Sequence, residues 1–436
     1  MSETNLVHLK APDCWINDPN GFIYFKGMYH LFYQCFPYAT QWGRMHWGHA
    51  VSKDLVQWEH KGIALYPSKL DDRSGCFSGS AVEQDGKMHL IYTGVNYIEE
   101  DPENINACLN DQFQSAQLMI TSENGMTFDN LADKKTVIPP IAVQHIGSKT
   151  HTRDPKVWRE KDAWYMVLGS SVEGKGRLLF YRSKDLQHWE YVNHAEKENF
   201  GWMWECPDYF ETDGEKVLIF SPMGFLNDGK AYDSAAVCMI PEFDAESCTM
   251  HLPDEFQFLD YGLDLYAPQS TTDAEGRRVL VAWARMPEAV DGKWNGMFCI
   301  PRMVEVKNGH IYFRPHPNVQ NRFTKKISSP TEAGKGGYKI SLDIDEGAEI
   351  NIGGYRISYR NNRVSADRST VFAAHDEIRC HFETPAIHEG NHLEIYVASN
   401  LIEVYINNGE YVLSNVVYGL SDQIQAENYE IFTTQD

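Results

Sequence analysis

A hairpin pattern that recurs five times along the 436-residue chain limits its fold more than any other feature. In each copy a polar or acidic phrase leads into a strand, a turn and an apolar strand. The copies cover residues 17–34, 78–94, 153–170, 205–222 and 267–284. Counting from Asp18, Ser78, Asp154, Glu205 and Ala267 to Gly27, Gly86, Asp162, Gly214 and Gly276 gives offsets of nine, eight, eight, nine and nine residues. Hairpins of constant phase that close into a ring bring their first residues to one place.

The segments between these hairpins carry a second shared phrase. It reads SKDLVQWEH at 52–60, TSENGMTFDN at 121–130 and RSKDLQHWE at 182–190, as expected where the third strand of a blade turns into the fourth. Successive hairpin turns lie 59, 76, 52 and 62 residues apart, which is room for four strands and their loops. The sequence therefore predicts an all-β chain, with a five-bladed β-propeller over residues 1–325. The polar segment 101–114 is expected to form an extra loop at the rim or on the outer surface.

A second, smaller domain is predicted after the propeller. Small residues, Pro and Gly cluster over 327–339, so we expect a linker at 326–336. Apolar runs at 339–344, 393–399, 401–415 and 429–434, with a hairpin turn at 407–409, then predict a short C-terminal β-sandwich over 337–436.

Composition narrows the class of partner. The formal charge of −22 argues against nucleic-acid and anionic-membrane partners, and no run approaches the roughly 20 apolar residues of a membrane span. Nine scattered cysteines without CxxC spacing, and a start without a signal-peptide pattern, indicate reduced thiols and a cytoplasmic location. The histidines are scattered, and we expect neither a metal nor another cofactor.

Three acidic residues stand at equivalent phases of the predicted ring. Asp18 lies in WINDPNG, Asp154 in RDP and Glu205 in WMWECPDYF. Turn chemistry alone could explain the first motif and a surface ion pair the second. Glu205 is flanked by Trp202 and Trp204, and partial desolvation would raise its pKa and suit it to donate a proton. Carboxyl groups in different environments are the machinery of glycoside cleavage. Aromatic residues that could stack on a sugar are Trp15, Trp42, Trp47, Phe77 and Trp283.

The order of the motifs resembles glycoside hydrolase family 32, the invertases, sucrose-6-phosphate hydrolases and fructan-degrading enzymes. The resemblance rests on WINDPNG (15–21), YQ (33–34), WGHA (47–50), FSGSA (77–81), RDP (153–155), ECP (205–207), YGLDLYAPQ (261–269) and WNGMFCIPR (294–302). LIEVYINNGEYVLS, at 401–414, is similar to part of that family's C-terminal sandwich. The tail is short for the family, which puts tail-borne dimer or substrate contacts in doubt.

The resemblance implies a role for each matching residue. Asp18 would be the nucleophile, Glu205 the general acid and base, and Asp154 the group that holds fructosyl hydroxyls and stabilises the transition state. Substrate-binding positions would be Asn17, Gln34, Trp42, Phe77, Ser78 and Arg153, with Asp264, Tyr266 and Trp283 at the border. Cys206 is expected to pack and position rather than react. We further expect Arg153 to keep Asp154 ionised, and an ionised Asp18 to raise the proton affinity of Glu205.

The implied activity is hydrolysis, with retention, of terminal β-D-fructofuranosyl linkages in sucrose and short fructo-oligosaccharides. One alternative is a sucrose-6-phosphate hydrolase, whose phosphate could meet Arg44, Arg73, His151 or Arg177. Others are a non-catalytic fructan-binding propeller and an inverting arabinan hydrolase. Chain-length and linkage preference would depend on rim segments 38–46, 95–115 and 223–233, and the chain could act as a monomer or a homodimer.

Overall fold

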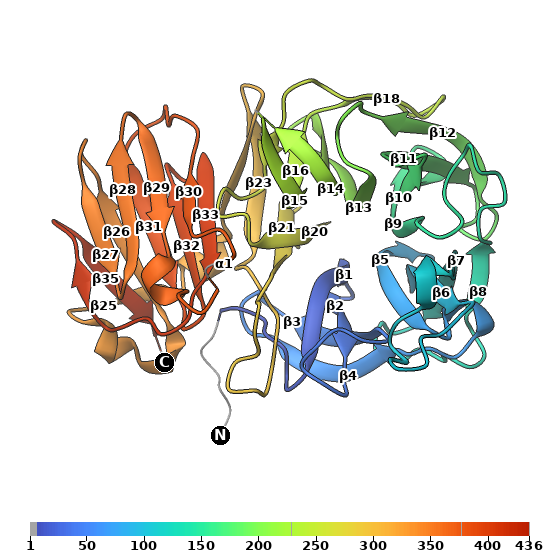
Figure 1. Ribbon diagram of the computed structural model, residues 1–436, viewed down its shortest axis with the longest axis horizontal. Coiled ribbons are helices and arrows are strands. Elements are labelled where there is room, and N and C mark those ends of the chain that lie inside the picture. The colour runs from blue at the N-terminus through green and yellow to red at the C-terminus, as the bar shows by residue number, and fades with distance from the viewer. Residues whose placement is uncertain (1–6, 228, 376, 436) are drawn as a thin grey trace.

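The computed structural model describes residues 7–227, 229–375 and 377–435. Strands dominate, and they form a ring of five radial sheets beside two stacked sheets (Figure 1). Besides α1 (Pro317–Gln320), the short helical elements are the 3₁₀ turns η1 (Leu70–Asp72), η2 (Leu109–Asp111), η3 (Pro330–Gly336) and η4 (Ser369–Val371). No helix within the described ranges has the length and apolar character needed to cross a bilayer.

The first three blades are four-stranded antiparallel sheets in which each strand pairs with the next along the chain. Blade 1 holds β1 (Trp15–Phe25), β2 (Met28–Phe36), β3 (His46–Ser52) and β4 (Glu59–Leu65). Blade 2 holds β5 (Gly75–Gln84), β6 (Lys87–Tyr97), β7 (Phe113–Ser122) and β8 (Lys135–Ile138). Blade 3 holds β9 (Arg153–Glu160), β10 (Ala163–Val172), β11 (Lys175–Ser183) and β12 (Glu190–Glu196).

Blades 4 and 5 have the same order with additional short strands. Blade 4 holds β13 (Met203–Thr212), β14 (Glu215–Asn227), β16 (Val237–Met239) and β19 (Gln257–Phe258), with β15 (Lys230–Ser234) paired to β14. Between β16 and β19 the chain forms a separate hairpin of β17 (Glu242–Asp244) and β18 (Thr249–His251). Blade 5 holds β20 (Leu265–Thr272), β21 (Arg278–Ala284), β23 (Arg302–Lys307) and β24 (His310–Pro315), with β22 (Met297–Phe298) paired to β21. The predicted five-bladed propeller is confirmed.

All five predicted hairpins form the two inner strands of a blade. In blade 1 the turn residues Lys26 and Gly27 have φ of 49° and 81°, the left-handed pair that matches strand twist in a tight hairpin. The second shared phrase closes blades 1 to 3, as predicted. There a carboxylate or amide oxygen of Asp54, Asn124 or Asp185 accepts hydrogen bonds from backbone N–H groups two and three residues ahead.

The ring closes through its innermost strands. Strand β1 contacts both β5 and β20, and further contacts run from β5 to β9, from β9 to β13 and from β13 to β20. The N-terminal segment completes the join, because the N–H of Ala11 bonds to the carbonyl of Gly296 and the N–H of Ile16 to that of Asn295. The first and last blades are therefore linked by backbone hydrogen bonds as well as by packing.

The C-terminal domain is a sandwich of two antiparallel sheets. One sheet holds, in spatial order, β25 (Phe323–Ile327), β35 (Glu430–Thr434), β26 (Tyr338–Asp343), β31 (His392–Val397), β32 (Leu401–Ile406) and β33 (Tyr411–Val416). The other holds β30 (His381–Glu383), β29 (Arg363–Asp367), β28 (Tyr355–Arg360), β27 (Glu349–Ile352) and β34 (Ile424–Gln425). Because β25 pairs with β35, residues 323–327 lie in the sandwich, ahead of most of the expected linker.

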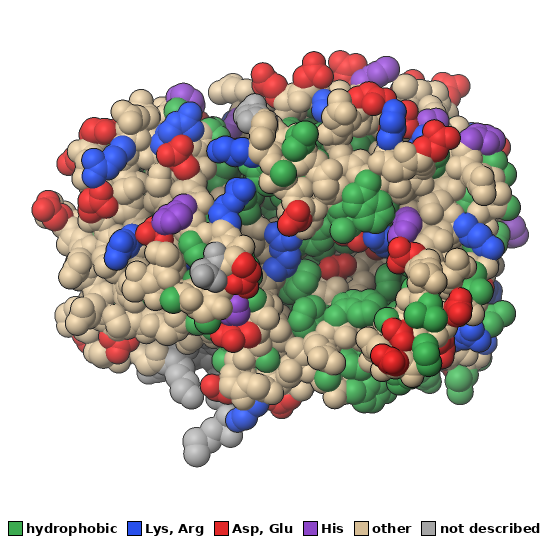
Figure 2. Space-filling view, in the orientation of Figure 1, with side chains coloured by type: hydrophobic (Ala, Val, Ile, Leu, Met, Phe, Trp, Pro, Cys, Tyr) green, Lys and Arg blue, Asp and Glu red, His purple; other side chains and the backbone are tan. Residues whose placement is uncertain are grey.

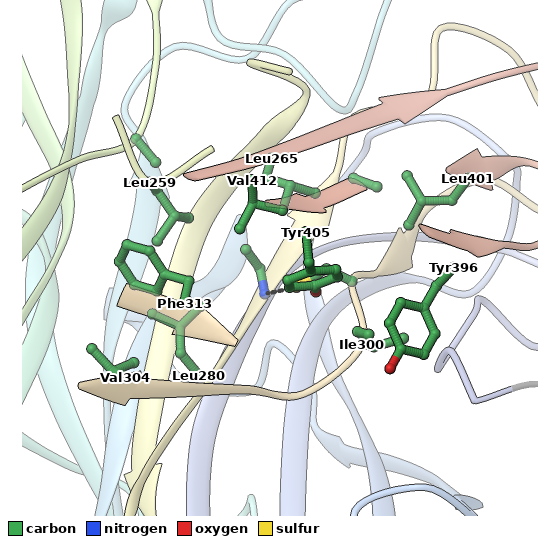
Figure 3. Close-up of a cluster of buried hydrophobic side chains, with 14 of the residues drawn as sticks. Leu259, Leu265, Leu280, Ile300, Val304, Phe313, Tyr396, Leu401, Tyr405 and Val412 are labelled. Carbon is green, nitrogen blue, oxygen red and sulfur yellow. Dashed lines mark hydrogen bonds between the residues drawn. The ribbon is translucent and has the colours of Figure 1, made fainter. Parts of the chain in front are cut away.

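One hydrophobic core runs across the contact between the two domains (Figure 3). It joins side chains of blades 4 and 5, such as Leu280 and Phe313, to Tyr405 and Val412 of the sandwich. Beside it, Arg302 is fully buried and donates to Asp260 at 2.9 Å and to Glu403 at 2.7 Å. The sandwich therefore packs against the propeller through a shared apolar core and a buried ion-pair cluster.

Candidate active site

A hollow in the face of the propeller holds the predicted acids. Figure 2 shows acidic side chains at its floor and hydrophobic side chains around it. The cavity has a volume of about 490 Å³. Its lining residues are Asn17, Asp18, Gln34, Trp42, Phe77, Val95, Tyr97, Asn106, Ala107, Cys108, Asp111, Phe113, His151, Arg153, Asp154, Glu205, Tyr266 and Trp283. Asp18, Asp154 and Glu205, from three different blades, therefore share one pocket.

Irregular pairing in the innermost strands turns these side chains toward the pocket. The register between first and second strands shifts between Ile16 and Pro19, and again between Glu205 and Asp208. Equivalent shifts occur at 76–79, 153–156 and 266–269 in the other blades. Asp154 and Cys206 have φ of 66° and 48°, a left-handed conformation that non-glycine residues rarely adopt. Bulges of this kind re-aim side chains, and here they occur at the phase that the repeat predicted.

Asp18 is held from below by neutral donors. Its Oδ2 accepts a hydrogen bond from the hydroxyl of Ser78, and its Oδ1 accepts one from Asn17 Nδ2 at 3.2 Å. Gln34 connects these two donors, because its Nε2 donates to Ser78 and its Oε1 accepts from Asn17. Burial raises the pKa of Asp18, while the hydrogen bond from Ser78 acts in the opposite direction. Ser78 thus lies behind Asp18 rather than in the wall of the cavity.

Glu205 is bound by a cation on one oxygen and by a phenol on the other. Arg153 donates to Oε1 through Nη2 at 2.7 Å and Nε at 3.1 Å. The hydroxyl of Tyr266 donates to Oε2 at 2.6 Å. The expected apolar surroundings of Glu205 are wrong: Trp204 is fully buried in a core cluster, and the ring of Trp202 packs against His151. Neighbouring residues of a strand point to opposite faces, which separates Trp204 from the pocket.

Asp154 is positioned by backbone groups. Its Oδ2 accepts from the N–H of Cys206 at 2.9 Å, and its own N–H donates to Thr93. Burial raises the pKa of Asp154 to about 7, although the charge of Arg153 acts in the opposite direction. Arg153 thus favours the ionised form of Asp154, as expected, but burial has the larger effect and the guanidinium pairs with Glu205. The thiol of Cys206 lies 3.5 Å from one carboxyl oxygen of Asp18 and one of Asp154 and is partly buried, and desolvation together with these nearby carboxyl groups raises its pKa.

The aromatic residues divide into a wall and a core. The rings of Trp42 and Phe77 pack edge to face with their centroids 6.1 Å apart, and those of Trp15 and Trp283 do so with their centroids 5.8 Å apart. Trp47, expected as a stacking surface, is fully buried in the core of blades 1 and 2. Trp15 Nε1 donates to Asn17 Oδ1 at 2.9 Å, so it holds that amide toward Asp18.

Asp264, predicted at the border of the substrate-binding site, lies elsewhere in the structure. Its carboxylate is bound by the guanidinium of Arg368 and by the N–H of Val416, both in the sandwich. With its oxygens engaged across the domain contact, Asp264 does not line the cavity, whereas Tyr266, two residues on, does. The alternation of side chains along a strand could not predict these contacts of Asp264, because Arg368 and Val416 lie 104 and 152 residues away in the sequence.

The rim segment 95–115, on which chain-length and linkage preference is expected to depend, contributes to the wall of the cavity. No individual residue of this segment is predicted as a site residue from the sequence. In the structure Tyr97, Asp111 and Phe113 line the cavity. The third expected rim segment, 223–233, contributes to a different cleft, which it forms with Arg379 and Phe382 of the sandwich.

One histidine spacing in the sequence is typical of zinc sites, although the histidines as a whole are scattered. His388, Glu389 and His392 match the HExxH pattern, which needs a helix to place both rings on one face. Here the pattern lies in a loop and the first residue of β31, and His392 pairs with Asp343 at 2.7 Å. Within the described ranges, His, Cys, Asp and Glu side chains form no group of three or more suited to a metal ion.

Comparison with known proteins settles the family. The profile described as "Glycosyl hydrolases family 32 N-terminal domain" matches residues 8–315, and that described as "Glycosyl hydrolases family 32 C terminal" matches residues 319–435. The chain belongs to glycosyl hydrolase family 32. It is therefore a glycoside hydrolase, which disfavours the alternative of a non-catalytic binding propeller.

Relatives of this family 32 chain cover almost its whole length. A sucrose-6-phosphate hydrolase of Escherichia coli is 32% identical over 97% of this chain and 91% of its own. A raffinose invertase of Escherichia coli is 31% identical over the same shares. Among solved structures, a Bombyx mori GH32 beta-fructofuranosidase in complex with sucrose has a TM-score of 0.83 at 29% identity and covers 99% of this chain and 94% of its own. The predicted family and fold are thus confirmed.

Proposed function

We propose that this family 32 enzyme removes terminal β-D-fructofuranosyl units from sucrose and short fructo-oligosaccharides with retention of configuration. The observation that carries the proposal is the presence of Asp18, Asp154 and Glu205 in one cavity of sugar size. The raffinose invertase and the beta-fructofuranosidase among the similar proteins support the same reaction class.

The chemistry follows from the contacts of the three acids. Asp18 attacks the anomeric carbon of the fructosyl unit, and Glu205 gives its proton to the departing glycosidic oxygen. Water, deprotonated by Glu205, then attacks the same carbon and releases Asp18. Asp154, fixed by the N–H of Cys206, accepts hydrogen bonds from ring hydroxyls as positive charge develops. Asn17 and Gln34, which are bonded to each other and to the Asp18–Ser78 pair, complete the floor under the fructosyl ring.

Stereochemistry and one substitution test this assignment. Nuclear magnetic resonance of early sucrose hydrolysis should show β-fructofuranose as the first product, and Asp18→Asn should abolish turnover while the protein still folds. Initial formation of the α-anomer would replace retention with inversion, as in the arabinan hydrolase alternative. In a fructose-bound crystal structure the carboxyl groups of Asp18 and Glu205 should lie about 5–5.5 Å apart, since inverting enzymes hold theirs roughly 6.5–9.5 Å apart.

Sucrose 6-phosphate is the second candidate substrate, because several relatives, including the Escherichia coli protein, are sucrose-6-phosphate hydrolases. Values of kcat/KM for sucrose, its 6-phosphate, 1-kestose and inulin separate the candidates. The nine cysteines are all unpaired, which supports a reducing, cytoplasmic location for the enzyme. Gel filtration with light scattering would distinguish a monomer from a homodimer.

A further inference from the structure

The leaving group has a defined exit from the pocket. Asp154 is buried and Asp18 half-buried at the floor, and Glu205 completes the group of acids. A sugar unit released after protonation by Glu205 extends away from this floor toward the mouth. His151 links this wall to the acid, because its ring packs against Phe113 and lies beside Arg153, which binds Glu205. Asp111 also acts on the charge of His151. A substituent on the leaving group that Glu205 protonates therefore faces the wall that Tyr97, Asp111 and Phe113 line.

Acidic side chains outnumber basic ones in the lining of the cavity. Four carboxyl groups line the cavity, namely Asp18, Asp154, Glu205 and Asp111. Arg153 is the one Lys or Arg side chain among the lining residues, and its Nε and Nη2 are already bound to Glu205. A phosphate on the substrate would therefore find no uncommitted guanidinium or ammonium group in this lining.

The three arginines named from the sequence as phosphate partners do not line the cavity. Arg44 pairs with Glu100 at 2.9 Å and donates to the carbonyl of Ile105. Arg73 donates to the carbonyl of Tyr97. A third arginine, Arg177, is mostly buried and pairs with Glu196.

His151 does line the cavity, but it lies beside Arg153 at 3.4 Å. Burial and the charge of Arg153 lower the pKa of His151, so its ring is neutral at pH 7. A neutral imidazole offers a phosphate no compensating charge. Of the four candidates named from the sequence, none supplies a free positive charge to the pocket.

Asp111 is the carboxylate on the wall itself. It ends the 3₁₀ turn η2, where Asn110 and Asp111 have φ of 53° and 52°. The turn is fixed by the N–H of Leu109, which donates to the carbonyl of Glu99 at 3.0 Å, and by the N–H of Gln112, which donates to that of Leu109 at 2.9 Å. Asp111 is also close enough to His151 to act on the charge of its ring.

We propose that Asp111 makes the leaving-group side of the pocket select uncharged sugars over phosphorylated ones. A phosphate monoester carries about −1.5 to −2 charges at pH 7, and Asp111 adds a like charge where the leaving group must pass. The inference rests on the proposed function and specifies its substrate class: terminal fructosides whose leaving group bears no phosphate.

Specificity ratios of charge variants test the proposal. The ratio of kcat/KM for sucrose to that for sucrose 6-phosphate should exceed one in the wild-type enzyme. Asp111→Asn should lower this ratio by about fivefold through better use of the phosphate, because one like charge is removed. Asp111→Glu should keep the wild-type ratio. Glu103→Gln, which removes a charge from the same loop outside the cavity lining, is the matched control and should also keep it.

The salt dependence of the specificity ratio distinguishes an electrostatic role of Asp111 from a purely structural one. Raising NaCl from about 20 to about 300 mM should lower the ratio of the wild type and change that of Asp111→Asn much less, since screening weakens repulsion between separated charges. A ratio that is unchanged in Asp111→Asn, or a wild type that prefers the phosphate, would overturn the proposal. Failure to hydrolyse either sugar would instead overturn the proposed function.

Discussion

The hydroxyl of Tyr266 donates to one oxygen of Glu205, at 2.6 Å, and Arg153 holds the other oxygen from the opposite side. Both contacts come from other blades, Arg153 from the start of β9 and Tyr266 from β20. The acid and base group of the proposed reaction is therefore oriented by its neighbours in the ring. Its own strand, β13, places the backbone of Glu205, and the neighbouring blades orient its carboxyl group.

Tyr266→Phe removes the hydroxyl from this arrangement and keeps the ring. We expect kcat to fall about tenfold to hundredfold, the range for losing a hydrogen bond to a charged group, with a smaller change in KM. Steady-state kinetics on sucrose measure both. Tyr38→Phe, at an exposed tyrosine, is the control and should match the wild type. Equal losses in the two variants would remove the role assigned to the Tyr266 hydroxyl.

Glu205→Gln removes the proposed proton donor while the volume of the side chain is kept. Turnover of sucrose should fall about 10²- to 10⁴-fold, the usual contribution of proton transfer. A fructoside with an activated leaving group needs little protonation, so stopped-flow kinetics should show part of the first step restored. If binding and fold are intact and no restoration is seen, Glu205 is not the acid.

Asp154 gives a pH-dependent prediction for stability. Its pKa is raised by burial from an ordinary value of 3.8 to about 7, so the folded protein binds this proton more tightly than the unfolded chain does. Stability contributed by this group is therefore present at low pH and is lost as pH rises from about 4 to about 7. Asp154→Asn, which cannot ionise, should raise the melting temperature by a few degrees at pH 8 and much less at pH 4.5. Calorimetry at the two pH values checks the sign, and a larger gain at the lower pH would contradict it.

Arg302→Met should destabilise the whole chain. The substitution leaves Asp260 and Glu403 buried without their cation, and breaking a buried pair in this way costs about 3–5 kcal/mol. Arg360→Met, which breaks the exposed pair with Glu349, should cost less than about 1 kcal/mol. Denaturant titrations followed by tryptophan fluorescence would compare the two. Similar costs would mean that the buried cluster adds nothing to the domain contact.

The hairpins and the three acids could be predicted because each one is specified by residues that are close together in the sequence. A turn such as Lys26–Gly27 and the strands beside it are encoded within some twenty residues, and constant phase carries Asp18, Asp154 and Glu205 to one end of the ring. The family resemblance supplied their roles, which remain proposals.

Partners that are distant in sequence could not be predicted in the same way. Asp264 was placed at the sugar because it precedes Tyr266 by two residues, yet Arg368 of the sandwich takes its carboxylate. Arg153 was assigned to Asp154, its neighbour in sequence, but its guanidinium reaches Glu205 across a blade boundary. Such choices depend on how blades and domains pack, which no short motif encodes.

The backbone join between the N-terminal segment and residues 295–296 has a consequence for synthesis. A ribosome must deliver nearly three hundred residues before it makes Asn295, whose carbonyl accepts the hydrogen bond from the N–H of Ile16, so the early blades first form an open arc. Until blade 5 closes the ring, no backbone contact fixes blade 1, with Asp18, relative to blade 4, with Glu205. A nascent chain stalled before blade 5 should therefore have no activity.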